Sequence, residues 1–479
     1  MKTLLELLRD SALSVVFHVA PRFANVFIFI LIGRLAGPDQ AGVFALATTY
    51  LLIITTVMRG LDDLLIRQVA REPDRSASYL ANFLLLRLVL AVILYAALVT
   101  VVLGVFNYAA TTAIPIIVLA LSVLPDSLGF VAQSVMLGQR RFGPPAAILG
   151  TANLFKLIVG AVVFMRGGSL IDIAWIWFIG SGLAMVGLIA TVLRQVGGLR
   201  HTDWLNFAPL KDHWRTALSF TAITVLATLD SQTDTILLSV FRSETEVGWY
   251  AAATTITFSL FILAQAYRFS VYPLMTRYAQ RAPDKLAVLF HKSIHYVAVI
   301  SMPLVVGVMI LALPILLFVY GVKFAPAAPI LQVLIISLLF FFLAEPCNRI
   351  MLVNDRQRVM LIILAISAST NVALNLLLIP RFGAVGAGFS RSCSASIYFI
   401  VIYLYIVRDL VSPAALSGIA RVTISTGLMA AVTLSMLSFH IIINVMVSAC
   451  AYLGFLWLTK AIPTEDRRLV RQYISEKFK

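Results

Sequence analysis

Residues 79–105 read YLANFLLLRLVLAVILYAALVTVVLGV, an apolar stretch with a single charged side chain, Arg87. A helix of about 20 residues is long enough to cross the roughly 30 Å of hydrocarbon in a bilayer. Residues 79–105 exceed that length and therefore predict a transmembrane helix.

The rest of the chain has the same apolar character. Of its 479 residues, 61% are hydrophobic and 12% are charged, whereas globular domains have about half and a quarter. A soluble domain would place charge throughout its surface, so this composition excludes one. The net charge of +15 comes from small groups of Lys and Arg between apolar runs. That distribution indicates membrane topology rather than a nucleic-acid partner.

Apolar windows of about 20 residues predict an all-α integral membrane protein with about fourteen transmembrane helices. We divide the chain into an N-terminal six-helix bundle at 1–193, a cytoplasmic linker at 194–214 and a second six-helix bundle at 215–410. Two further helices and a basic tail occupy 411–479. The first span is expected to be uncleaved because its apolar run is too long for a signal peptide. The predicted spans are 11–33, 40–66, 79–105, 111–137, 144–166, 170–193, 215–241, 247–272, 286–320, 327–352, 359–379, 383–407, 415–438 and 441–460.

Lys and Arg outside the spans are distributed unequally over the two sides of this topology. One side, which includes both termini, holds 25 of them, and the other holds only Arg34, Arg166, Arg242, Lys323 and Arg381. Because short cytoplasmic loops retain positive charge, both termini are predicted to be cytoplasmic.

An internal repeat appears when the chain is compared with itself at an offset of 206 residues. Residues 41–49, AGVFALATT, then meet residues 247–255, VGWYAAATT, and no gap is needed back through the preceding helix. Gly42 meets Gly248, and Phe44 meets Tyr250. The repeat predicts duplication of a six-helix half, an arrangement that places substrate sites at the interface of the halves.

The chain resembles the multidrug/oligosaccharidyl-lipid/polysaccharide (MOP) flippase superfamily, and within it the polysaccharide flippases of bacterial O-antigen and exopolysaccharide assembly. The resemblance depends on four strings in order: GRLAGPDQAGVFALA at 33–47, LDSQTDTILLSVFRSETEVGWYAAA at 229–253, YPLMTR at 272–277 and NLLLIPRFGAVGAG at 375–388. It implies two pseudo-symmetric six-helix bundles in a V around a central cavity. It also implies export of lipid-linked oligosaccharides by alternating access.

Thirteen ionisable side chains fall inside the predicted spans. Each would cost about 2.5 to 3.5 kcal/mol if it faced lipid, so they must pair or line a hydrated cavity. Arg59 with Asp63, and Glu345 with Arg349, are spaced i, i+4 and can pair on one helix face; we assign the second as a structural pair. The set comprises Arg22, Arg59, Arg87, Lys156, Arg268, Arg349, Arg391, Asp62, Asp63, Asp126, Asp230, Asp234 and Glu345.

The cations of this set supply the substrate-binding candidates. Arg22 lies near the middle of the first span without an acidic neighbour on its own helix, and it needs an anionic partner. That partner is either an aspartate of another helix or a phosphate of a lipid carrier, which arginine binds through two donors. The resemblance implies that Arg22, Arg59 and Arg268 line the cavity together. Lys156 and Arg391 are weaker candidates.

Asp230 and Asp234 share one face of the seventh predicted helix. Such a pair can bind H⁺ or Na⁺ as a coupling ion, or it can neutralise an arginine. His291 and His295 have the spacing of metal ligands, but no acidic residue or cysteine follows nearby, so no metal is expected. No phosphate-binding loop or catalytic triad stands out, and no other cofactor is expected.

The resemblance implies a flippase, not an enzyme, that moves undecaprenyl-pyrophosphate-linked oligosaccharide across the bacterial inner membrane. The expected partners are this substrate, membrane lipid, and polysaccharide polymerase and chain-length proteins, but not nucleic acid. The flippase itself is expected to be a monomer. A cation-exporting drug transporter is one alternative, although its cavity should favour acidic residues. A membrane polysaccharide polymerase or ligase is the other, although it needs larger outer loops.

Overall fold

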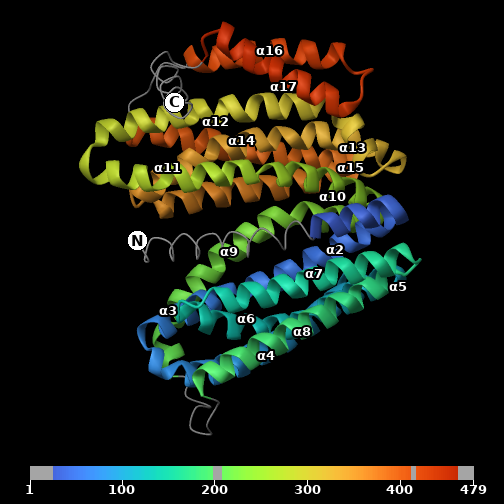
Figure 1. Cartoon of the computed structure of the whole chain (residues 1–479), viewed down its shortest axis with the longest axis vertical. Helices are drawn as coiled ribbons and strands as arrows, with labels where there is room; N and C mark the ends of the chain where they lie inside the picture. The colour runs from blue at the N-terminus through green and yellow to red at the C-terminus, as the bar shows by residue number, and fades with distance from the viewer. Residues whose placement is uncertain (1–24, 198–207, 412–416, 462–479) are drawn as a thin grey trace, which may run out of the picture. The chain divides into compact units, whose positions relative to one another are not determined.

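The computed structural model describes residues 25–197, 208–411 and 417–461, and every regular element within these ranges is a helix. This confirms the predicted all-α class. The chain divides into two compact units, Met1–Ala251 and Ala252–Lys479, each built from long helices lying side by side (Figure 1). The predicted boundaries at 193, 214 and 410 come from the apolar spans and the polar stretch between them, and they stay a prediction.

The core of the first unit forms where four of its helices meet. Leu65 of α3, Leu80 of α4, Val135 of α6 and Val192 of α8 are fully buried there. α8 also packs against α7, so it lies between α6 and α7. The labelled helices of this unit before α10 are α2 (Pro38–Val57), α3 (Arg59–Arg71), α4 (Ser76–Thr100), α5 (Ala110–Ala120), α6 (Val123–Gly138), α7 (Gly143–Met165), α8 (Leu170–Val196) and α9 (Ala208–Phe241).

Two predicted spans of the first unit are each broken into two helices. The span at 40–66 becomes α2 and α3, which are separated at Met58. The span at 111–137 becomes α5 and α6, with the break before Val123. Pro125 is the third residue of α6, and proline has no N–H to continue the hydrogen bonds of α5.

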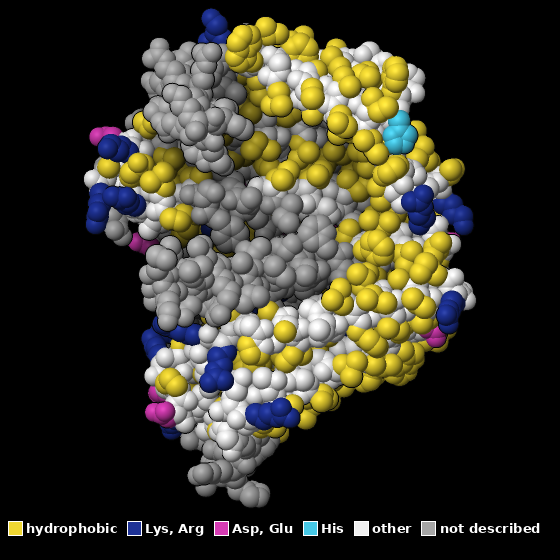
Figure 2. All heavy atoms as spheres, viewed as in Figure 1, with side chains coloured by type: hydrophobic (Ala, Val, Ile, Leu, Met, Phe, Trp, Pro, Cys, Tyr) yellow, Lys and Arg dark blue, Asp and Glu magenta, His cyan; other side chains and the backbone are white. Residues whose placement is uncertain are grey.

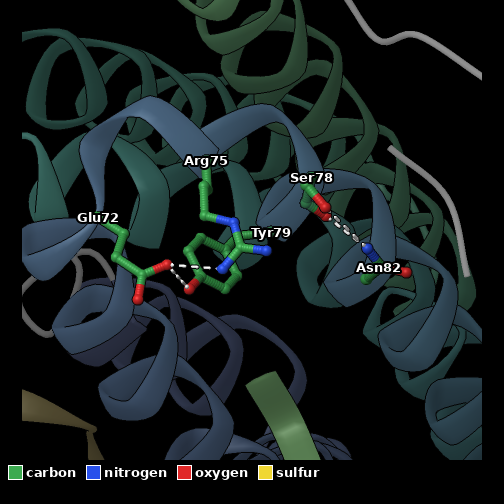
Figure 3. A network of polar contacts seen from close by, with 5 residues as sticks. All are labelled: Glu72, Arg75, Ser78, Tyr79 and Asn82. Carbon is green, nitrogen blue, oxygen red and sulfur yellow. Dashed lines mark hydrogen bonds and ion pairs between the residues drawn. The ribbon is translucent and has the colours of Figure 1, made fainter. Parts of the chain in front are cut away.

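A polar network fixes the turn between α3 and α4 (Figure 3). The Glu72 carboxylate accepts hydrogen bonds from Arg75 Nη1 at 3.0 Å and from the Tyr79 hydroxyl at 2.8 Å. One turn later, Asn82 Nδ2 donates to the Ser78 carbonyl at 2.7 Å. These contacts hold the short helix η1 (Pro73–Arg75) against the start of α4.

The second unit centres on α14 (Ala328–Val353), which packs against α12 (Pro283–Ile310) and α15 (Gln357–Asp409). α16 (Ser417–Ser435) packs against α12 and α17 (Ile441–Leu458). α11 (Ile262–Arg281) and the short α13 (Ala312–Val319) also belong to this unit.

α15 folds back on itself at Gly383. The backbone is not helical there, with φ of 56° and ψ of −137°. In a straight helix Ser367 and Ser394 would be about 40 Å apart, yet the Ser367 hydroxyl donates to the Ser394 carbonyl at 3.0 Å. The two arms of α15 therefore correspond to the two predicted spans at 359–379 and 383–407.

Ten helical stretches of the described residues are long and apolar enough to cross a membrane. α15 counts once among them, and α5 and α6 together count once. The predicted spans at 215–241 and 247–272 are not among these ten, and the first span lies mostly outside the described residues. The count of fourteen therefore stays a prediction. Figure 2 shows hydrophobic side chains spread over the surfaces of α16 and α17, and outward-facing Leu88, Val92 and Ile93 do the same on α4. The chain is a multi-pass membrane protein, because water would not tolerate such surfaces.

Candidate functional site

Two predicted substrate-binding residues cannot be placed. Arg22 lies outside the described residues, and Arg268 lies on α11 with a side chain that is also outside the description. Their roles stay predictions.

Gly42 of α2 and Gly248 of α10 (Glu244–Leu260), which the sequence repeat pairs, meet within the first unit; we name their contact the glycine crossing. A Cβ built on Gly42 would lie 1.9 Å from the carbonyl oxygen of Glu244, and one on Gly248 would lie 2.0 Å from that of Pro38. Pro38 and Glu244 are also repeat equivalents, so the contact is the same from both sides, as in a two-fold interface. A side chain at either glycine would force the helices apart.

Polar contacts surround the glycine crossing. The Thr245 hydroxyl donates to the Asp39 carboxylate, and these two residues are again separated by 206 positions. The Thr112 hydroxyl donates to the Glu244 carboxylate at 2.8 Å. The loops at Gly37 and Ser243 begin α2 and α10, and the charge distribution predicts that both loops are non-cytoplasmic. The glycine crossing therefore lies at the predicted outer ends of the two helices.

A polar seam joins α2 to α9 further along. Thr49 Oγ1 lies 3.0 Å from Gln232 Oε1. Tyr108 bridges the two helices, because its hydroxyl is 3.0 Å from the Tyr50 hydroxyl and 2.6 Å from Ser239 Oγ. Hydroxyl and amide groups are also the partners that a saccharide hydroxyl can bond.

Asp234, a predicted ion-coupling residue, is 1% exposed and accepts a hydrogen bond from the Tyr250 hydroxyl at 2.7 Å. Tyr250 is the repeat equivalent of Phe44, so at this position the second repeat has a hydroxyl that the first repeat lacks. Asp230 lies one turn earlier on α9 and is partly buried. The sequence placed both carboxylates on one face but did not indicate that Tyr250 binds Asp234.

Arg59 and Asp63 are exposed at the start of α3. The buried ion pair of this helix instead joins Asp62 to Arg87 of α4, whose side chain is 1% exposed. Asp62 and Arg87 were both recognised as intramembrane charges, but residues on different helices have no spacing that would pair them in advance.

Lys156 points into the first unit. Its ammonium donates to the Ser181 hydroxyl of α8 at 2.8 Å and lies 5.8 Å from the centre of the Trp177 ring. Arg391 is 3% exposed on the second arm of α15. Next to it, Asn371 Nδ2 of the first arm donates to Ser394 Oγ at 3.3 Å. Both cations are thus in polar, packed surroundings, and their substrate-binding roles stay predictions.

Arg349 Nη2 lies 3.2 Å from Glu345 Oε2. These two residues are the i, i+4 pair that the sequence analysis assigned as structural. The guanidinium also lies 5.5 Å from the centre of the Tyr272 ring of α11. Arg349 therefore connects α14 to α11 in addition to its contact with Glu345.

Within the described residues, no group of three His, Cys, Asp or Glu side chains is placed to hold a metal ion. His295 Nε2 lies 2.9 Å from the carbonyl oxygen of Ala461. His291 packs its ring against Phe290. The two histidines thus have different neighbours.

A sequence profile of the family described as polysaccharide biosynthesis protein matches residues 29–329. The chain is also similar to two proteins of Haloferax volcanii. It is 21% identical to the probable low-salt glycan biosynthesis flippase Agl15 over 428 residues, 87% of this chain and 86% of that protein. It is 26% identical to the probable flippase AglR over 261 residues, which cover 51% and 52% of the two chains.

Solved structures share the fold. The lipid II flippase MurJ in an inward closed conformation superposes with a TM-score of 0.73 and 16% identity, over 93% of this chain and 97% of MurJ. An inward-facing multidrug resistance MATE transporter of the MOP superfamily gives a TM-score of 0.65 and 15% identity, over 82% and 98% of the chains. Identities this low establish the MurJ- and MATE-like fold alone.

Proposed function

Since this chain belongs to the polysaccharide biosynthesis protein family, we propose that it is a flippase for lipid-linked oligosaccharide. The substrate in this proposal is an undecaprenyl-pyrophosphate-linked repeat unit of O-antigen, capsule or exopolysaccharide. The protein moves it across the bacterial inner membrane by alternating access. The two Haloferax volcanii relatives that match are probable flippases, which supports a transporter rather than an enzyme.

The glycine crossing is the observation that carries this proposal. A carrier built from two repeats needs a closure that both repeats form and that opens without a covalent change. Gly42 and Gly248 supply a contact of backbone against backbone, with the Asp39–Thr245 hydrogen bond beside it. No long side chains interdigitate at such a contact, so the two helices can separate and meet again at the outer side in every cycle.

The substrate head group is anionic, and the predicted intramembrane cations suit it. In the proposed cycle Arg22, Arg59 and Arg268 bind the pyrophosphate, while the lipid tail stays among the bilayer chains. The Tyr50–Tyr108–Ser239 contacts offer hydroxyl groups to the sugars once α2 and α9 separate. Asp230 and Asp234 bind the coupling ion, H⁺ or Na⁺.

The orientation in this proposal has both termini in the cytoplasm. Cysteines placed at Gly37, Ser243 and Gly383 should react with an impermeant thiol reagent added outside cells. Cysteines at Arg141, Asp203 and Lys285 should react only after permeabilisation. The reverse pattern would overturn the orientation.

The deciding experiment is to delete the gene and analyse the lipid-linked intermediates that accumulate. A flippase defect should leave complete oligosaccharide repeat units on their lipid carrier in the cytoplasmic leaflet, and restoring the gene should clear them. Complete units accumulating in the outer leaflet would instead indicate the polymerase or ligase alternative. Unchanged intermediates combined with sensitivity to cationic drugs would indicate the drug exporter, the alternative that the MATE-like fold keeps open.

A further inference from the structure

Lys156 lies on the stripe of α7 that packs against the rest of the first unit. Ala152 and Gly160, one turn before and after it, are both buried, and α7 packs against α8. Residues at i and i+4 share a helix face, so Lys156 projects toward α8 and away from lipid.

Three residues of α8 contact this side chain. A Cβ on Gly180 would lie 2.6 Å from Lys156 Cγ and 2.8 Å from its Cε, so the bare backbone of Gly180 accommodates the aliphatic stem. Ser181 accepts a hydrogen bond from the ammonium at 2.8 Å. The Trp177 ring, 5% exposed, lies 5.8 Å from the ammonium, within the range of a cation–π contact.

Asp126 approaches the same site from α6. α6 packs against α8, and the Asp126 carboxylate is electrostatically coupled to Lys156 and Ser181. One turn beyond Asp126, a Cβ on Gly129 would lie 3.5 Å from the Cα of Met185, which is one turn beyond Ser181. The helices therefore approach closely at this level and bring acid, hydroxyl and amine together from three helices.

Among the described residues of the helices packed around this site, Asp126 is its acid and Lys156 is its base. On α4, which packs against α6, Arg87 is bound to Asp62. α5, which packs against α8, has no ionisable side chain. On α2, the residue that meets Trp177 is the apolar Phe44, which packs edge-on with ring centres 5.7 Å apart.

We propose that Asp126, Ser181 and Lys156 form a proton-binding site inside the first unit. Carboxylate and ammonium together carry no net charge, and one proton added or removed changes the charge of the site by one. The cost of a buried charge depends on how much water reaches it, so a conformational change that alters hydration alters proton occupancy. The ammonium repels Na⁺ and other metal cations, which leaves the proton as the ion that fits. A role in coupling rests on the proposed transport function, whereas proton binding itself does not.

Trp177 provides a direct readout, because the ammonium beside its ring perturbs the indole electrostatically. The purified full-length protein in lipid nanodiscs is titrated from about pH 4 to about pH 10, a range that spans the ordinary pKa values of aspartate and lysine. The response of Trp177 is the emission of the unmodified chain minus that of the Trp177→Phe variant. We expect a pH-dependent difference that is lost in the double variant Asp126→Asn/Lys156→Met. Lys323→Met, which removes an exposed lysine, should leave the response unchanged.

A wild-type titration in the double variant, or no Trp177-dependent titration in the unmodified chain, would overturn the proposal. If the double variant does not fold, Gly180→Ala replaces it, because this variant keeps every ionisable group but crowds the lysine stem. Its titration midpoint should shift, and an unchanged midpoint would equally refute the site. The assay contains no transport substrate, so its failure leaves the proposed function standing.

Discussion

The two repeats differ most informatively at positions that are equally buried. Ile28 and Phe44 of the first repeat are 1% and 2% exposed. Their equivalents at the offset of 206, Asp234 and Tyr250, are also 1% and 2% exposed. In the first repeat Phe44 packs edge-on against Trp177, whereas in the second the Tyr250 hydroxyl binds the Asp234 carboxylate.

This difference shows that equal burial does not mean an equal role. A buried carboxylate costs several kcal/mol unless it is hydrogen-bonded, so Asp234 and Tyr250 depend on each other in a way that Ile28 and Phe44 do not. At another pair of equivalent positions the first repeat has the charged residue: Arg22 of the first repeat corresponds to the uncharged Thr228 of the second. Within the proposed function, Arg22 binds the anionic carrier and Asp234 binds a coupling cation.

The largest expected effect comes from Arg22, whose equivalent in the second repeat is the uncharged Thr228. Arg22→Ala should abolish flipping while the protein stays inserted at normal abundance, and Arg22→Lys should restore only part of the activity. Lysine keeps the charge but lacks the planar pair of donors that binds a phosphate. The measurement is clearance of the lipid-linked intermediate in the deletion strain.

Arg22 has a competing explanation, in which it only balances an aspartate of another helix. The double substitutions of Arg22→Ala with Asp126→Asn, Asp230→Asn or Asp234→Asn distinguish the two. Recovered transport in any of them, or unchanged transport in Arg22→Ala, would remove Arg22 from the substrate site.

The second prediction tests the symmetry of the glycine crossing. Gly42→Leu and Gly248→Leu should each destabilise the closed outer side by about 1–3 kcal/mol through overpacking, and to the same extent, because each glycine meets the carbonyl of the other repeat. Gly150→Leu is the control, since nothing lies within 4 Å of a Cβ there. Transport rate and the reactivity of Thr245→Cys toward an external thiol reagent are measured. A large effect from one glycine and none from the other would disprove the two-fold contact.

The sequence predicted most of the helices but few of the contacts between side chains. Apolar length located the helices, and the offset of 206 paired Gly42 with Gly248. The break at Met58 escaped prediction because hydropathy does not register a turn inside an apolar run. The position of Lys156 also escaped prediction. α7 is apolar around most of its circumference, so no periodicity showed which face it buries, and the slot at Gly180 belongs to another helix.

The third prediction makes the second repeat resemble the first. Asp234→Ile should insert and transport, but it should lose the dependence of transport on pH or Na⁺, because the carboxylate that binds the ion is gone. Asp234→Asn keeps the shape and should lose the same dependence, while Asp230→Asn should change it only in part. Transport with unaltered ion dependence in both Asp234 variants would leave this residue only a packing role.

The last prediction concerns the hydroxyl by which Tyr250 and Phe44 differ, and its effect is on stability rather than on transport. Tyr250→Phe should lower the free energy of unfolding by about 1.5–3 kcal/mol, the range for a hydrogen bond to a charged group. The reciprocal Phe44→Tyr should also destabilise, by about 1–3 kcal/mol, because its hydroxyl would lie among buried apolar groups. Thermal unfolding in lipid nanodiscs measures both. A stable Phe44→Tyr would mean that the first repeat has a partner for that hydroxyl.

The most direct test of alternating access at the glycine crossing is to lock it reversibly. Asp39→Cys and Thr245→Cys replace two repeat-equivalent residues whose side chains touch, and the double variant is assayed for flipping in proteoliposomes before oxidation, after oxidation and after reduction. If the crossing opens in every cycle, flipping should stop when the two cysteines are joined and resume when they are reduced, with each single variant unaffected. Flipping that continues at the original rate in the fully cross-linked protein would contradict the account.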